Sequence, residues 1–120
     1  MKFFLDTYAL IEIVKGNQNY KRFLDEDLYT TVLNLYELYY NLLKDFDKEN
    51  AREMFYKFYS YIIQIKDNWI FLASEFKLKN KKSNISYTDA LGYVIAKENE
   101  MKFLTGDKEF KALDDVEFVK

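Results

Sequence analysis

The stretch KFFLDT at residues 2–7 does most to set the fold class of this chain. The short apolar run Lys2–Leu5 predicts a buried strand, and the Asp6-Thr7 pair after it is typical of a helix start. Apolar residues at helical spacing then predict a helix over Tyr8–Lys15. A buried strand that passes directly into a helix is the first half of a strand–helix–strand unit, from which parallel sheets are built.

The same alternation of strand and helix continues to residue 119. We expect further strands at Leu28–Thr31, Ile62–Ile65, Lys102–Leu104 and Val116–Val119, and helices at Tyr20–Asp25, Val32–Lys44, Lys48–Ser60, Asn68–Leu78, Ser86–Asn99 and Lys108–Leu113. This order predicts an α/β fold of three layers, α/β/α, around a central, mostly parallel sheet of four to five strands. With 120 residues and no repeat or low-complexity linker, one domain spanning residues 1–120 is expected.

Composition excludes several kinds of chemistry. The chain has no cysteine and no histidine, which rules out disulfides, thiolate metal sites, cysteine nucleophiles, the Ser-His triad and the commonest zinc ligand. Hydrolytic chemistry would therefore depend on carboxylates, Lys, Tyr, Ser or Thr, or on a metal held by oxygen ligands. The net charge of −2 argues against wrapping nucleic acid by bulk charge, although it permits a local basic rim.

The N-terminus carries no signal-peptide pattern, because Met1 and Lys2 lead directly into the first expected strand. No apolar stretch approaches the length of a membrane span. A cytoplasmic protein without membrane association is therefore expected.

Two acidic residues follow expected strands, where a parallel sheet places its ligands, and a third lies at the start of an expected helix. Asp6 follows the first strand and Asp107 follows the strand at 102–104, and such sheets bind ligands beyond the carboxyl ends of their strands. Asp89 lies in the first turn of the helix at 86–99. Each also has a plausible structural role: Asp6 as a helix N-cap, Asp89 in a capping box with Ser86, and Asp107 as a turn residue.

Glu37 is harder to explain by local structure. The helix at 32–44 is apolar on nearly every side, and a lone buried carboxylate is costly unless it is paired, protonated or metal-bound. The alternative is a narrow solvent-exposed stripe shared with Asn34 and Asn41, which lie at helical spacing from Glu37.

Four carboxylates that converge would repel one another and raise one another's pKa values, and a divalent cation would relieve that repulsion. Oxygen ligands without His or Cys favour Mg²⁺ or Mn²⁺. Such a site can hold phosphate oxygens and lower the pKa of a bound water, so it could hydrolyse a phosphodiester without histidine.

Four segments of the sequence resemble those of a known protein family. The segments FLDT (4–7), YEL (36–38), DAL (89–91, continuing to Ala96) and LTGDKEF (104–110) resemble PIN-domain ribonucleases, in particular the VapC-like toxins of type II toxin–antitoxin pairs. The resemblance covers essentially the whole chain and implies a PIN-like fold. Two positions depart from the family pattern. Tyr8 stands where a small polar residue is frequent, and could narrow the cleft or offer a stacking surface; Glu109 stands where Asp is frequent.

The resemblance also implies what the site does. Asp6, Glu37, Asp89 and Asp107 would be the catalytic and metal-binding acids, with Thr105 as a hydroxyl ligand or orienting group and Thr7 in support. It implies Mg²⁺ or Mn²⁺ as cofactor, RNA as substrate and an antitoxin protein that blocks the site.

Two surface features suggest partner contacts. Lys79, Lys81, Lys82 and Lys108 flank the predicted site and could form a basic rim for RNA, or could simply be solvated. The helices at 32–44 and 48–62 carry more aromatic surface than one small domain can cover, and we expect part of it to form a homodimer interface or an antitoxin groove. Exposed tyrosines without a partner are the alternative. The eight residues concerned are Tyr36, Tyr39, Tyr40, Phe55, Tyr56, Phe58, Tyr59 and Tyr61.

The sequence therefore favours a metal-dependent endoribonuclease that is the toxin of a toxin–antitoxin pair. Two alternatives share the same fold: a PIN-like module that binds RNA or protein without hydrolysis, and an RNA-processing PIN nuclease that is not a toxin. A receiver-like signalling domain also clusters acids beyond a parallel sheet. It is disfavoured because Asp6 lacks an acidic neighbour and Glu37 lies in the middle of a helix.

Overall fold

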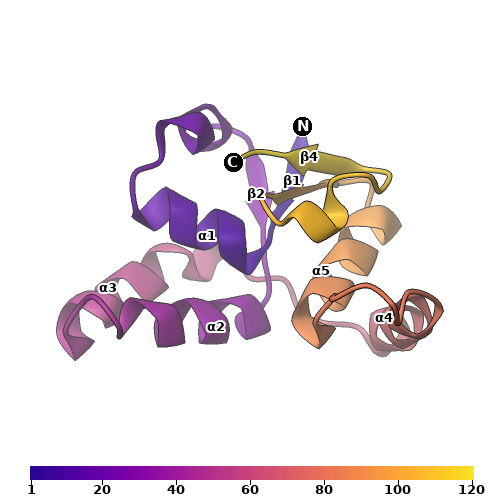
Figure 1. Ribbon diagram of the computed structural model, residues 1–120. Helices are drawn as coiled ribbons and strands as arrows, with labels where there is room; N and C mark the ends of the chain where they lie inside the picture. Colours follow the sequence, from indigo (N-terminus) through magenta and orange to yellow (C-terminus); the bar gives the residue numbers. More distant parts are fainter.

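The computed structural model describes residues 1–120 and contains one four-stranded sheet in the order β2-β1-β3-β4 (Figure 1). All three strand pairs are parallel. The strands are β1 (Lys2–Leu5), β2 (Asp27–Tyr29), β3 (Lys102–Thr105) and β4 (Val116–Phe118). The predicted mostly parallel sheet is therefore confirmed, with four strands.

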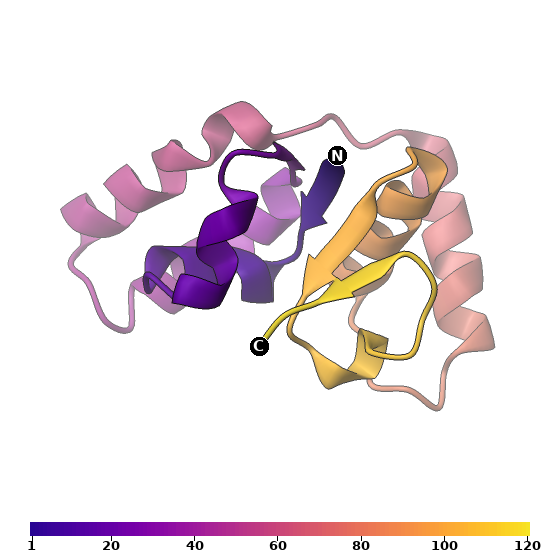
Figure 2. The ribbon, with the colours of Figure 1, turned by 90° about the horizontal axis from the view of Figure 1, so that it is seen from above.

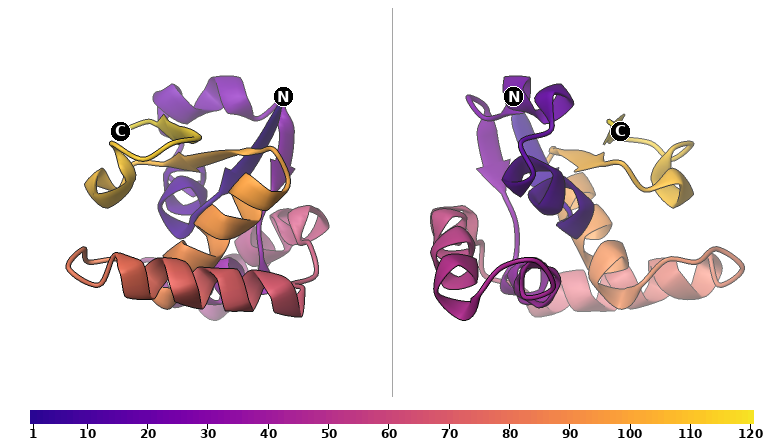
Figure 3. Two further views of the ribbon diagram at one scale, coloured as in Figure 1. Left: turned by 90° about the vertical axis from the view of Figure 1, so that its right-hand side faces the viewer. Right: turned by 60° about the vertical axis from the view of Figure 1, so that its left-hand side comes forward.

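Helices cover both faces of this sheet, as the α/β prediction required (Figures 2 and 3). On one side of the sheet lie α1 and α2, with α3 packed against α2; on the other side lies α5, with α4 packed against it. The α-helices are α1 (Thr7–Val14), α2 (Val32–Leu42), α3 (Lys48–Lys57), α4 (Asp67–Lys79) and α5 (Tyr87–Glu98). Three 3₁₀ helices complete the chain: η1 (Gln18–Phe23), η2 (Tyr59–Tyr61) and η3 (Lys108–Phe110). None of these helices has the length and apolar character needed to cross a bilayer.

The alternating side chains of β1 divide the core into two layers. Phe3 and Leu5 point into a cluster built with α1 and α2, whereas Phe4 points into the cluster formed with α4 and α5. Gly92 lets α5 come close to the sheet, because a Cβ at this position would lie 2.6 Å from Cε1 of Phe4. This close approach fixes the start of α5, and with it Asp89, near the sheet.

Several predicted elements differ from the structure. The predicted strand Ile62–Ile65 is wrong: only one bridge, between Thr30 and Ile62, joins this segment to the sheet. Its apolar residues Ile63 and Ile65 pack instead against the cluster on the α4–α5 side, which accounts for the strand-like pattern.

The other differences are at element ends. Thr31 lies outside β2 because its side chain caps α2 by accepting the amide of Asn34. The predicted helix Lys48–Ser60 ends earlier, at Lys57, and a separate 3₁₀ turn follows. Two predicted helices, Tyr20–Asp25 and Lys108–Leu113, are 3₁₀ turns at Gln18–Phe23 and Lys108–Phe110.

Candidate functional site

Strand β1 lies where the order of the sheet reverses, since β2 pairs with one of its edges and β3 with the other. Ligands of parallel sheets bind in the crevice outside the carboxyl ends of the strands at such a point. Here the carboxyl ends of β1 and β3 are joined directly, because the amide of Asp6 donates to the carbonyl of Leu104 at 3.4 Å. Asp6 follows β1, and Asp107 follows β3 by two residues.

A depression of about 600 Å³ opens at this crevice, and all four predicted acids line it. Its ten lining residues are Asp6, Thr7, Tyr8, Glu37, Ser86, Asp89, Gly106, Asp107, Lys108 and Lys120. Of the other predicted residues, Thr105 is buried at the end of β3. Lys79, Lys81 and Lys82 lie at the end of α4 and in the turn after it, and do not line the depression.

Asp6 is the most buried acid of the four, with 1% of its surface exposed. Its Oδ1 accepts a 2.8 Å hydrogen bond from the amide of Ala9, so it also serves as the N-cap of α1. Burial raises its pKa to about 8, and the charges of Asp89 and Asp107 act in the same direction against hydrogen bonds from Thr105 and Ala9. The N-cap of α1 is therefore also one of the acids that line the depression.

Asp89 lies in the first turn of α5, where its amide donates to the Ser86 hydroxyl at 3.1 Å. Burial raises the pKa of its carboxyl to about 6, Ser86 opposes this shift, and Asp107 and Glu37 add to it. The Ser86 half of the predicted capping box is present. It holds the backbone of Asp89 while the carboxyl lines the depression with the other acids.

Glu37 is held by a short chain of hydrogen bonds. Thr7 donates its hydroxyl to Glu37 Oε1 at 2.6 Å, and Asn34 Nδ2 donates to the same Thr7 oxygen at 3.2 Å. Thr31 in turn donates to Asn34 Oδ1 at 2.7 Å. Thr7, predicted only as a supporting residue, thus fixes one carboxylate of the site.

The expectation that Glu37 would be the buried acid is wrong. Glu37 is only half-buried, because α1 and α3 cover one side of α2 and leave Tyr36 73% and Tyr40 63% exposed. The alternative of a solvent stripe fails as well, since Asn34 is buried. Asp6 is the carboxyl removed from water.

Asp107 and Thr105 are held by the turn after β3. The Thr105 hydroxyl accepts the amide of Asp107 at 3.0 Å, and Asp107 Oδ1 accepts the amide of Glu109 at 3.0 Å. Because Thr105 also hydrogen-bonds Asp6, it links the acids that follow the two central strands. Its role as a hydroxyl ligand or orienting group stays a prediction.

The donor set of the depression suits a hard divalent cation, since it consists of carboxylates and hydroxyls. All four ion pairs of the structure lie elsewhere, so none supplies a positive partner to these acids. However, no three acids converge closely enough to hold one ion together in this conformation. The oxygen ligands of these residues fit Mg²⁺ or Mn²⁺, although the carboxylates that line the depression do not converge on one point.

Metal-free stability is expected to fall as the pH rises from about 4 to 8. Below a pH of about 4, Asp6 and Asp89 are protonated in both the folded and the unfolded chain. Above that, the unfolded chain loses these protons while the folded protein keeps them, up to pH about 6 at Asp89 and about 8 at Asp6. Thermal melting in EDTA at pH 5, 7 and 8.5 measures the trend. A melting temperature that rises over this interval would contradict the raised pKa values.

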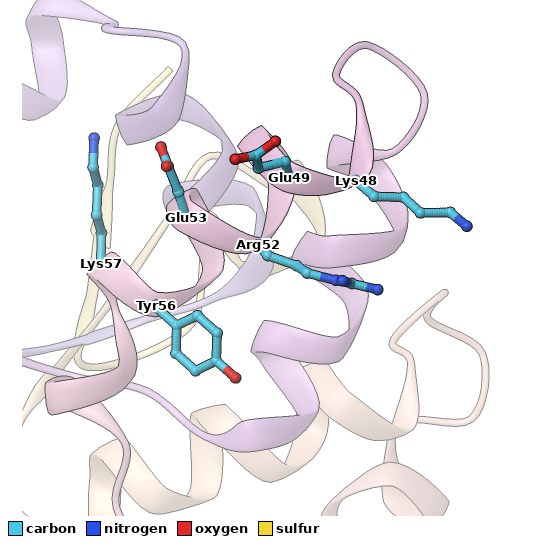
Figure 4. A pocket seen from close by; sticks show the side chains of 6 residues that line it. All are labelled: Lys48, Glu49, Arg52, Glu53, Tyr56 and Lys57. Atoms are coloured by element: carbon cyan, nitrogen blue, oxygen red, sulfur yellow. The ribbon is translucent and has the colours of Figure 1, made fainter.

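A second, larger hollow lies on α3 and has a different character (Figure 4). It has a volume of about 860 Å³ and is lined by Lys48, Glu49, Arg52, Glu53, Tyr56 and Lys57, all from one helix. Figure 4 shows these side chains spreading outward from the helix, with charges of both signs. None of them is buried, so this hollow is a solvated helix face.

Lys120 is the lining residue that the sequence interpretation missed. In the parallel register, Thr105 pairs with Phe118, so the residues after β4 reach the same edge of the sheet as Gly106 and Asp107. The signal was present in the sequence, because Lys120 follows a predicted strand just as Asp6 and Asp107 do.

Comparison with known proteins places these features in context. The family model of the PIN domain matches residues 3–116. A search among curated proteins finds no match.

Among solved structures, VapBC2 of Rickettsia felis, bound to a DNA fragment from its promoter, is 22% identical with a TM-score of 0.77, over 99% of this chain and 98% of that one. VapC20 of Mycobacterium tuberculosis, described as a sarcin–ricin-loop-cleaving toxin, is 16% identical with a TM-score of 0.77, over 98% and 96%. A toxin–antitoxin complex from Klebsiella pneumoniae is 18% identical with a TM-score of 0.72, over 95% and 94%. At these identities the likeness concerns the fold.

Proposed function

Because the chain belongs to the PIN-domain family, we propose that it is a Mg²⁺- or Mn²⁺-dependent endoribonuclease and the toxin of a toxin–antitoxin pair in the cytoplasm. The observation that carries this proposal is the shared depression at the reversal point of the sheet. It brings together Asp6, Glu37, Asp89 and Asp107, which are spread over a hundred residues of sequence. A buried acid among other acids is a poor arrangement for stability and a suitable one for binding a cation.

The four acids would hold the metal, which when bound supplies a counter-charge for phosphate oxygens and lowers the pKa of a water. The remaining residues orient these acids. Thr7 fixes the Glu37 carboxylate, and Thr105 links Asp6 to the turn of Asp107. Lys108, exposed at the rim, would attract the RNA backbone toward a depression that four acids line.

An antitoxin and a second copy of the chain are the proposed protein partners. The Klebsiella neighbour is itself a toxin–antitoxin complex. Of the aromatic residues on α2, α3 and the turn that follows α3, Phe58 is buried and Tyr39, Phe55 and Tyr61 are half-buried, whereas Tyr36, Tyr40, Tyr56 and Tyr59 are exposed. We propose that these four exposed tyrosines form the surface that binds a partner. Sedimentation of the purified protein at micromolar concentration tests the homodimer, and a monomer would contradict it.

A second function is favoured by one observation. Since no three acids converge on a single point, the structure also fits a PIN-like module that binds RNA or protein without hydrolysis. An RNA-processing nuclease that is not a toxin would share the site chemistry and differ only in its targets.

Incubation of the protein with end-labelled cellular RNA tests the proposed activity. We expect cleavage in Mg²⁺ or Mn²⁺, its loss in EDTA and its return when metal is added back. RNA that stays intact with every metal, although the protein binds it, would favour the binding module. Cleavage that persists in EDTA would contradict metal dependence. Growth arrest on expression in a bacterial host separates a toxin from an RNA-processing enzyme.

A further inference from the structure

Tyr8 occupies a well-defined place in the wall of the depression. Its ring lies directly against Gly106: a Cβ built there would lie 2.5 Å from Tyr8 Cζ and 2.6 Å from the carbonyl oxygen of Val119. Only a glycine at position 106 leaves room for this ring beside the chain that follows β4. Tyr8 and the backbone that follows β4 therefore both lie close to Gly106.

The ammonium group of Lys120 lies over the same ring, 5.5 Å from its centroid. A cation is attracted to the face of an aromatic ring, and this contact leaves its N–H donors available to other acceptors. The Tyr8 ring therefore contacts both Gly106 and the exposed Lys120 side chain. Tyr8 does more than narrow the cleft, because its ring supports a lysine.

The backbone that carries Lys120 is anchored on two sides. The Lys120 carbonyl accepts hydrogen bonds from Asn19 Nδ2 at 3.0 Å and Asn17 Nδ2 at 3.4 Å. The preceding residue, Val119, donates its amide to Thr105 at 2.8 Å and accepts the Tyr20 hydroxyl at 2.6 Å. A lysine on a fixed backbone loses less freedom when it binds than one on a mobile loop.

The charges of the depression make this lysine unusual. Lys108 and Lys120 are the only basic residues among its lining residues, beside four acids. Neither forms an ion pair within 4.0 Å. The Lys120 ammonium is therefore held by an uncharged ring next to the acids and remains free for an anion.

We propose that Lys120 binds a phosphate of the RNA backbone beside the acidic site, and that Tyr8 is a positioning residue that places the lysine there. The inference rests on the proposed function, since it names a substrate contact of the same site. It assigns a role to a pair of residues that is separate from the acids themselves.

The experiment compares Lys120→Gln with Lys111→Gln as a matched control. Lys111 also lies over an aromatic ring, that of Phe118 at 5.2 Å, but it does not line the depression. Binding of a fluorescein-labelled single-stranded oligoribonucleotide is measured by anisotropy in EDTA over a range of salt concentrations, and cleavage kinetics are measured in Mg²⁺.

For Lys120→Gln we expect about 3- to 10-fold weaker binding, and a slope of log Kd against log salt that is smaller by about 0.7, the value for one contact to a single strand. In cleavage, KM should rise by a similar factor with kcat little changed. Lys111→Gln should match the unmodified protein in all three quantities. Equal behaviour of the two variants would overturn the assignment, as would the absence of any RNA binding by the unmodified protein.

The binding measurement separates this inference from the proposed function. If the unmodified protein cleaves no RNA but binds it, and Lys120→Gln weakens that binding, the phosphate contact stands and hydrolysis fails. If the protein cleaves RNA and Lys120→Gln has no effect on binding or KM, the proposed function stands and the Lys120 inference fails.

A second pair of variants tests the role of Tyr8. Tyr8→Phe keeps the ring and should bind RNA as the unmodified protein does, whereas Tyr8→Leu should weaken binding in the same direction as Lys120→Gln. The double variant Tyr8→Leu/Lys120→Gln should be no weaker than Lys120→Gln alone, because Tyr8 acts through the lysine. Additive losses in variants with unchanged melting temperatures would overturn the positioning role.

Discussion

Replacing Asp6 with asparagine is expected to stabilise the metal-free protein at pH 7 by on the order of 1–3 kcal/mol. The unfolded chain holds an ionised Asp6 at this pH, whereas burial and the charges of Asp89 and Asp107 keep the pKa of the folded protein near 8. An uncharged amide removes that difference. Asparagine is also a good N-cap, so the hydrogen bond from Ala9 can be kept.

Asp47→Asn is the matched control for this prediction. Asp47 is likewise an N-cap, accepting the amide of Asn50 at 2.8 Å at the start of α3, but it is exposed. Its replacement should change stability by less than about 0.5 kcal/mol. Urea unfolding in EDTA measures both variants. A destabilised Asp6→Asn variant would contradict the prediction, and so would an Asp6→Asn variant whose stability keeps the pH dependence expected of the unmodified protein.

Asp89→Asn is expected to lower the rate of metal-dependent RNA cleavage by about 100-fold or more. A catalytic metal supplies several kcal/mol of transition-state stabilisation, and each 1.36 kcal/mol is a factor of ten in rate. Folding should be preserved, because Ser86 caps α5 through the backbone amide of Asp89 and not only through its carboxyl. The rate is measured on labelled RNA at saturating Mg²⁺.

The control for Asp89→Asn is Asp67→Asn, which alters an exposed acid in the first turn of α4. It removes the same favourable interaction with a helix N-terminus, so it separates helix stability from site chemistry. We expect no more than a twofold change in its cleavage rate. Equal rates for the two variants would exclude Asp89 from the site.

Much of the fold could be predicted from the sequence because local patterns specify it strongly. The strands at Lys2–Leu5 and Lys102–Leu104 are short apolar runs, each followed by polar residues, and both were placed within one residue of their ends. Parallel pairing then brings their carboxyl ends to one edge, which explains why Asp6 and Asp107 line the same depression.

The burial of each acid could not be predicted, because it depends on which helices cover which surface. The apolar pattern of α2 suggested that Glu37 is enclosed, yet α2 keeps an exposed side with Tyr36 and Tyr40. Asp6 is buried because it lies between β1, β3 and the start of α1, contacts that involve residues a hundred positions apart. The structure of Ile62–Ile65 could not be predicted for the same reason, because its apolar residues pack against the core without forming a strand.

The central claim is that the depression at the ends of β1 and β3 is a divalent-metal site, and titration calorimetry with Mn²⁺ at pH 7 tests it most directly. We expect the unmodified protein and Asp47→Asn to bind Mn²⁺ equally, and Asp6→Asn and Asp89→Asn to bind it at least about tenfold more weakly. Binding should release protons, because the raised pKa of Asp6 leaves its carboxyl largely protonated at this pH. Equal Mn²⁺ binding by all four proteins, or none by the unmodified one, would contradict the claim.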